Sequence, residues 1–69
     1  MKPLNEIVAQ NLVELRKKSG LTQQQLAENF SYSDKTVSKW ELGYAIPSVE
    51  VLKSLADYYG VNVDYFLVE

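Results

Sequence analysis

The stretch that decides the fold is residues 22–43, which read TQQQLAENFSYSDKTVSKWELG. It contains two short amphipathic segments, and each follows a hydroxyl residue of the kind that caps a helix N-terminus, Thr22 or Ser33. Gln25 stands three residues after Thr22, which is the spacing of a reciprocal capping box. Gly43 is suited to end the second segment. The stretch therefore predicts two short helices joined by a tight turn, so that one can lie in a DNA groove while the other braces it.

Helical periodicity continues on both sides of this stretch, and no segment has the pattern of a strand. The expected helices cover about residues 5–19, 23–30, 34–42, 48–59 and 63–67. Their apolar side chains recur at helical spacing, and the following are expected to face inward: Leu4, Val8, Leu12, Leu15, Leu26, Ala27, Phe30, Val37, Trp40, Val49, Leu52, Leu55, Ala56, Tyr59, Val63, Phe66 and Leu67. Because the connections are short, the sequence predicts an all-α fold, a compact five-helix domain.

Size and composition restrict the function. The 69 residues allow a single domain over residues 1–69, and whether this is the N-terminal part of a longer protein stays open. The chain has neither cysteine nor histidine, which rules out zinc sites and Ser-His-Asp triads, so we expect no enzyme, no metal and no cofactor. No apolar run suits a signal peptide or a membrane span, so a soluble cytoplasmic domain is the default expectation.

The charge balance is acidic, with a net charge of −2 and a pI near 5.0. This balance counts against a nucleic-acid binder, because a basic patch is the usual electrostatic signature of one. However, basic residues concentrate at the end of the first helix and on the third, at Arg16, Lys17, Lys18, Lys35 and Lys39. We therefore expect a weakly positive face on an acidic body.

The third helix has an outward polar row. Residues at positions i, i+1, i+4 and i+5 share one side of a helix, and here they are Asp34, Lys35, Ser38 and Lys39. All four can form hydrogen bonds with base edges or phosphates, and the opposite side of the helix is apolar. A helix that reads the major groove needs this combination. The alternative is that the row is only the solvated face of an amphipathic helix.

The whole pattern resembles the Cro/repressor-type helix-turn-helix domain, also called the lambda-repressor-like or xenobiotic-response-element family. The matching motifs are LRKKSGLTQQQLAENF, then S-x-x-TVSKWELG, then IPSVEVLKSLADYYGV and a closing VDYFL. They occur in the family's order and spacing and cover about residues 7–67. The resemblance implies sequence-specific binding of double-stranded DNA by a bacterial or phage transcriptional regulator.

The resemblance also implies roles for individual residues. The base-facing positions are Asp34, Lys35, Ser38 and Lys39. The positions that touch phosphates are Gln23, Thr36, Tyr44 and Ser48. The family has a pair that joins the first helix to the end of the third, here Arg16 and Glu41, and the alternative is that these are two unrelated surface charges. From the chemistry of base edges, lysines favour guanine O6 and N7, and an aspartate can accept a hydrogen bond from cytosine N4.

The chain departs from the family in two turns. Many relatives have glycine and a small aliphatic residue between the second and third helices, where this chain has Ser31 and Tyr32. Tyr32 can still plug the core with its ring. Many relatives also have a basic residue after the glycine that ends the third helix, whereas Tyr44 and Ala45 carry no charge. We therefore expect weak binding by one copy.

A homodimer on a two-fold-related site would supply the missing affinity. The resemblance suggests the fifth helix and the C-terminus as the dimer surface, with Tyr65 and Val68 as exposed candidates, unless both pack on their own core. A second function stays open: a protein-interaction module, such as the antitoxin of a toxin–antitoxin pair. The acidic pI and the uncharged loop after Gly43 favour that alternative slightly.

Overall fold

The computed structural model describes residues 2–69, so Met1, the first residue of the expected domain, lies outside the described part. Within residues 2–69 the elements are α1 (Leu4–Lys18), α2 (Gln23–Asn29), α3 (Asp34–Glu41), α4 (Val49–Tyr59) and the 3₁₀ turn η1 (Val63–Phe66). These residues form no strand, which confirms the all-α prediction. None of the helices in this part of the chain is long and apolar enough to cross a membrane.

The prediction of a fifth α-helix over residues 63–67 is wrong in the type of helix. Residues 63–66 form a single 3₁₀ turn, and its backbone bonds span three residues, as in the 3.0 Å bond from the Leu67 N–H to the Asp64 carbonyl. Asn62 precedes the turn but makes no side-chain capping bond. Four residues without a cap do not sustain an α-helix, and short pieces of this kind adopt 3₁₀ geometry instead.

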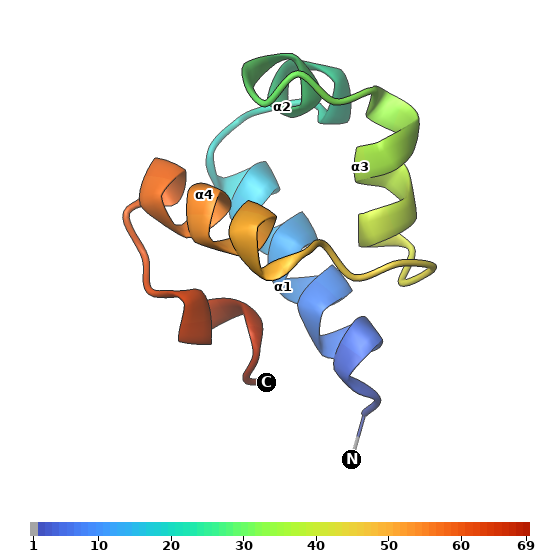
Figure 1. Cartoon of the computed structure of the whole chain (residues 1–69), viewed down its shortest axis with the longest axis vertical. Coiled ribbons are helices and arrows are strands. Elements are labelled where there is room, and N and C mark those ends of the chain that lie inside the picture. The colour runs from blue at the N-terminus through green and yellow to red at the C-terminus, as the bar shows by residue number, and fades with distance from the viewer. Residues whose placement is uncertain (1) are drawn as a thin grey trace.

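The helices are arranged around α1. Figure 1 shows α2 and α3 meeting at a corner at one end of the molecule, while the two termini lie near each other at the opposite end. The backbone N–H of Lys2 donates to Glu69 Oε1 at 3.3 Å. The side-chain amide of Asn11 in α1 donates to the carbonyls of Phe66 (3.2 Å) and Val68 (2.8 Å). The C-terminal segment is therefore held along α1.

One apolar core holds the elements together. The buried apolar residues come from all five elements: Val8, Ala9, Leu12, Leu26, Ala27, Val37, Trp40, Leu52, Leu55, Ala56 and Phe66. Leu15, Phe30, Tyr59 and Val63 are half-buried against them. Trp40 is thus a core residue and is not free to stack on bases.

Three apolar residues expected in the core are exposed. Leu4 is 50% exposed and Val49 is 77% exposed, and each is the first residue of its helix. Leu67 follows η1 and is also exposed. Helical periodicity places these residues on the apolar side, but the end of a helix projects beyond the neighbours that would cover it. The periodic pattern therefore predicts the buried face correctly and its ends incorrectly.

Short helices depend on their caps, because nucleation is costly and α2 and α3 have only 7 and 8 residues. The N-cap hydroxyls of Thr22, Ser33 and Ser48 each accept a backbone N–H from three residues further on, at 3.1, 3.2 and 3.2 Å. The Gln25 side chain also accepts from the Thr22 N–H at 2.9 Å. This confirms the predicted capping box.

The turn between α2 and α3 contains a residue in an unfavourable conformation. Ser31 has a φ of 60°, the left-handed region that glycine adopts at little cost. The Tyr32 N–H bonds to the Ala27 carbonyl at 2.9 Å and the Ser31 N–H to the Glu28 carbonyl at 3.4 Å, which is the Schellman pattern. The Tyr32 ring packs edge-on against Trp40, with centroids 5.3 Å apart, while part of it stays exposed. Tyr32 therefore covers the core from outside.

We predict that Ser31→Gly stabilises the domain by about 0.5–1 kcal/mol. Glycine relieves the left-handed strain, and this gain exceeds the extra entropy it gives the unfolded chain. Urea unfolding followed by Trp40 fluorescence measures the change. Ser54→Gly is the matched control, because Ser54 lies inside α4 and the same substitution there should destabilise by about 1 kcal/mol. A loss of stability in both variants would contradict the prediction.

Candidate nucleic-acid interface

The outer side of α3 carries the polar row. Val37 and Trp40 are buried on the inner side. The outer side holds the four residues predicted to read bases: Asp34, Lys35 and Lys39 are exposed, and Ser38 is half-buried at the edge of the row. Within residues 2–69, no hydrogen bond or ion pair occupies any of these four side chains. The row is therefore free to bind a partner outside the chain.

The residues predicted to touch phosphates lie at the ends of three helices. Gln23 is the first residue of α2 and Ser48 is the N-cap of α4. Thr36 lies in the first turn of α3, where its hydroxyl is 3.1 Å from that of Ser33. Tyr44 lies in the loop after α3 and is among the most exposed side chains of the chain. All four are polar groups near the surface, and Gln23 is also tied to α3.

A charged network fixes the angle of α3. Arg16 in α1 binds Glu41, the last residue of α3, through two hydrogen bonds: Nε to Oε2 at 2.6 Å and Nη2 to Oε1 at 2.9 Å. The Gln23 amide donates to the same carboxylate at 3.0 Å. Arg16 Nη1 donates to the Leu21 carbonyl at 2.8 Å. One guanidinium and one carboxylate thus join α1, the α1–α2 link, α2 and α3.

This network is largely withdrawn from water. The side chains of Arg16 and Glu41 are 12% and 6% exposed, whereas those of the surface pair Lys53 and Asp57 are 63% and 65% exposed at the same 2.6 Å separation. The hydrogen bonds to Glu41 raise the pKa of the Arg16 guanidinium above its usual value, although burial acts in the opposite direction. The two pairs therefore differ in burial, and also because Arg16 makes two hydrogen bonds to Glu41 whereas Lys53 makes one to Asp57.

A second tie between α1 and the C-terminal end of α3 was not predicted from the sequence. Asn5 in α1 donates its side-chain amide to the Gly43 carbonyl at 2.8 Å. Gly43 has a φ of 80°, and a Cβ there would lie 3.5 Å from the Asn5 amide. In the sequence, the only sign of this bond is that Asn5 is polar and directly follows Leu4, the first residue of the apolar stripe of α1. Asn5 and the charged network therefore hold α1 to the C-terminal end of α3.

The predicted dimer residues differ in exposure. Val68 is exposed, as expected. Tyr65 is half-buried, packed against the core and edge-on to Phe66 at 5.8 Å. The expectation that Tyr65 is exposed is therefore wrong, and only part of this side chain is available to a second copy.

Tyr59 has a buried hydroxyl that finds no hydrogen-bond partner within residues 2–69. Burial raises its pKa to about 12, with smaller contributions from neighbours that include Tyr58, Arg16 and Glu41. The group thus lies near the charged network without being bonded to it. A buried hydroxyl left unpaired is a local cost to stability.

Two short capped helices, a buried anchor opposite an unpaired polar row, and a network that fixes the angle between the helices define a helix-turn-helix domain. The chain belongs to the helix-turn-helix family, which it matches over residues 12–66. This confirms the family resemblance seen in the motifs.

Two relatives show what the family includes. The chain is 40% identical over 58 residues to the HTH-type transcriptional activator BcrR of Enterococcus faecalis, a match that covers 84% of this chain and 28% of the relative. It is 33% identical over 60 residues to the HTH-type transcriptional regulator ImmR of Bacillus subtilis, covering 87% of this chain and 47% of the relative. The chain spans less than half the length of both.

Solved structures agree on the fold. The solution structure of the SOS-response transcriptional repressor LexA from Eubacterium rectale has a TM-score of 0.89 and 30% identity, covering 96% of this chain and 70% of that chain. The S. venezulae BldD DNA-binding domain has a TM-score of 0.80 and 27% identity, covering 94% and 97%. The all-helical arrangement is therefore shared along almost the whole chain.

We predict that Glu41→Gln destabilises the domain by about 2–3 kcal/mol, because it leaves a largely buried guanidinium without its counter-charge. Chemical unfolding at pH 7 measures the loss. Asp57→Asn is the matched control: it breaks an equally short but exposed pair and should cost less than about 0.5 kcal/mol. Equal effects of the two substitutions would mean that burial does not distinguish the pairs.

We predict that Tyr59→Phe keeps or slightly raises stability at pH 7, because it removes an unpaired hydroxyl. The folded protein holds the Tyr59 proton up to a pKa of about 12, whereas the unfolded chain releases it near pH 10. The stability that depends on this proton is therefore complete below pH 10 and is lost as the pH rises towards 12. At pH 11 the native chain should have lost about 1 kcal/mol relative to the variant. Parallel stability curves from pH 9 to pH 11.5 would contradict this.

Proposed function

We propose that this chain is the DNA-reading domain of a bacterial or phage transcriptional regulator and binds double-stranded DNA sequence-specifically. The observation that carries the proposal is the outer side of α3, where Asp34, Lys35, Ser38 and Lys39 are unpaired while the inner side is buried. An eight-residue helix is roughly 12 Å long, comparable to the width of the major groove. The relatives, which are transcriptional regulators by name, support the same conclusion.

The chemistry of the row suggests which bases it reads. Lys35 and Lys39 are donors that suit guanine O6 and N7, and Asp34 is an acceptor that suits cytosine N4. Ser38 is shorter and can donate or accept, so it tolerates several bases. A row with two donors and one acceptor favours a site containing G·C pairs in more than one orientation.

Phosphate contacts would fix the register on the duplex. In this proposal Gln23 contacts a phosphate with the amide hydrogen that Glu41 does not use. The same side chain then binds the DNA backbone and helps to fix the angle of α3. The hydroxyls of Thr36 and Tyr44 are donors at the start of α3 and in the loop after it. Ser48 lies at the start of α4, where the helix dipole favours an anion.

Binding by two copies is part of the proposal. The domain carries a net charge of −2 and few lysines face the duplex, so one copy gains little from counterion release. Two copies on a two-fold-related site, with half-sites about 34 Å apart, would double the contacts. Val68 and the exposed part of Tyr65 are the proposed start of the homodimer surface. Such a regulator acts where the chromosome lies, in the bacterial cytoplasm.

One observation favours a second candidate, a protein-interaction module. The segment that follows α3 exposes four apolar side chains, which are Leu42, Tyr44, Ile46 and Val49. They follow α3 along the chain and carry no positive charge for a phosphate. Electrophoretic mobility shift with mixed genomic DNA at low salt separates the two functions, because a chain that acts only on proteins shifts no duplex.

We predict that Lys35→Ala relaxes base preference at one position of the selected site, since a lysine–guanine contact contributes about 1–3 kcal/mol of discrimination. Selection from random duplexes, followed by sequencing, measures the preference. Lys53→Ala is the matched control, because Lys53 is an exposed lysine on α4, paired with Asp57 and outside the polar row. Unaltered preference in a folded Lys35→Ala variant would place the specificity elsewhere.

A further inference from the structure

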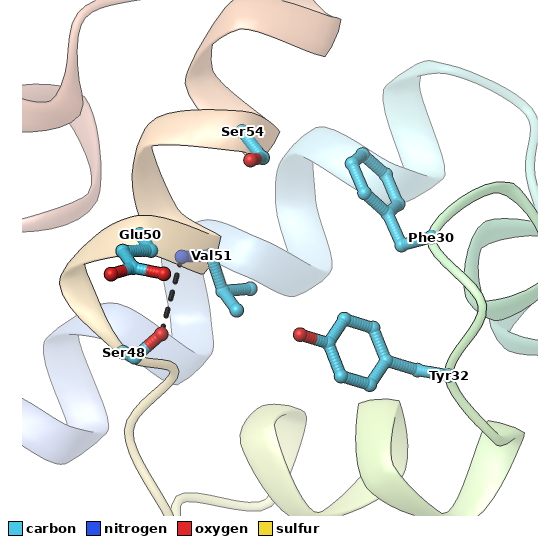
Figure 2. A pocket seen from close by; sticks show the side chains of 6 residues that line it. All are labelled: Phe30, Tyr32, Ser48, Glu50, Val51 and Ser54. Carbon is cyan, nitrogen blue, oxygen red and sulfur yellow. Dashed lines mark hydrogen bonds between the residues drawn. The ribbon is translucent and has the colours of Figure 1, made fainter.

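A hollow of about 240 Å³ lies between the α2–α3 turn and the first turns of α4. Its lining residues are Phe30, Tyr32, Ser48, Glu50, Val51 and Ser54. Figure 2 shows the Tyr32 hydroxyl directed across the hollow towards Ser48 and Val51, with the Phe30 ring beside it. None of the residues proposed to read bases lines it, so the hollow is separate from the polar row.

The residues that line the hollow are fixed by contacts with neighbouring side chains and backbone. The Tyr32 ring packs edge-on against Trp40 at 5.3 Å, and the Phe30 ring packs edge-on against Tyr58, also at 5.3 Å. Ser48 Oγ is engaged by the Val51 N–H at 3.2 Å, which orients the first turn of α4. A preformed hollow needs little ordering when a ligand binds.

The lining chemistry selects a cation. Two aromatic residues, two serines and one glutamate line the space, and no lysine or arginine is among the lining residues. The basic residue of α4, Lys53, bonds to Asp57 at 2.6 Å, and Glu50 makes no ion pair within residues 2–69. An anion would meet the Glu50 carboxylate, whereas an ammonium group can lie against aromatic faces and pair with it.

We propose that this hollow binds a small organic cation of the quaternary ammonium class, and that its occupation strengthens DNA binding. The second half rests on the proposed function, in which Ser48 contacts a phosphate. Glu50 stands two residues from Ser48 and exposes a negative charge near that phosphate. A cation held beside Glu50 cancels this repulsion, so the chain binds the duplex more tightly when the hollow is filled.

The first experiment tests the site without DNA. The ¹⁵N-labelled chain is titrated with choline chloride, and separately with 3,3-dimethylbutan-1-ol, the uncharged analogue of the same shape, at constant ionic strength. We expect choline to shift saturably the amide signals of residues 30–32 and 48–54, and the alcohol not to. Similar shifts with both compounds would overturn the assignment of a cation site.

Two variants sharpen this test. Glu50→Gln should weaken choline binding by at least about threefold, because it removes the only charge in the wall. Glu14→Gln makes the same substitution at an exposed residue of α1 outside the hollow and should leave choline binding unchanged. Equal choline affinity in the two variants would overturn the role of Glu50. Both positions are exposed, so neither substitution disturbs the core.

The second experiment measures DNA affinity at low salt with choline chloride or with matched sodium chloride. We expect choline to tighten binding by about threefold, Glu50→Gln to tighten it without choline, and choline to have no further effect on that variant. Choline that binds the hollow but leaves DNA affinity unchanged would overturn the coupling. If the chain binds choline as expected but binds no duplex, the proposed function fails and the cation site stands.

Discussion

The position of α3 depends on the paired hydrogen bonds between Arg16 and Glu41. Glu41 is the last residue of α3, where the helix dipole disfavours a carboxylate. The residue is therefore unfavourable within its own helix and is stabilised by the guanidinium of another. Because Gln23 and the Leu21 carbonyl complete the same network, the angle between α2 and α3 is set from α1. A helix that reads bases needs such a fixed angle, since base-edge hydrogen bonds tolerate little displacement.

Local signals in the sequence predicted the local structure well. The hydroxyls of Thr22 and Ser33 cap helices because their partners lie three residues away, a distance that the sequence shows directly. The buried sides of α3 and α4 were also predictable, because helical periodicity depends on residues only three or four positions apart. Periodicity predicts that Leu4 and Val49 are buried, but burial at a helix end depends on the neighbouring helices. The sequence predicts an α-helix over residues 63–67 because Asn62 is a suitable N-cap residue, but Asn62 makes no capping bond and the short segment forms a 3₁₀ turn.

Contacts between distant residues had no such signal. The pairing of Arg16 with Glu41 was available only through the family resemblance, since 25 positions separate them. The bond from Asn5 to the Gly43 carbonyl was missed altogether, because any polar side chain could make it and only the fold brings the two groups together. The hollow beside α4 is harder still to predict from the sequence, because its six lining residues come from two separate segments, the α2–α3 turn and α4.

The acidic balance of the chain shapes the proposed recognition. With Lys35 and Lys39 as the positive charges on α3, and Asp34 on the same row, nonspecific attraction to the phosphate backbone is weak. In the proposed function, specificity then depends on the hydrogen bonds that the α3 row makes with base edges, because the sequence-independent attraction is small. The same reasoning makes each negative charge near the duplex consequential. In a basic protein, one glutamate at this position would change the attraction to the phosphate backbone little. In this chain Glu50 opposes only a few positive charges, so neutralising it changes that attraction appreciably.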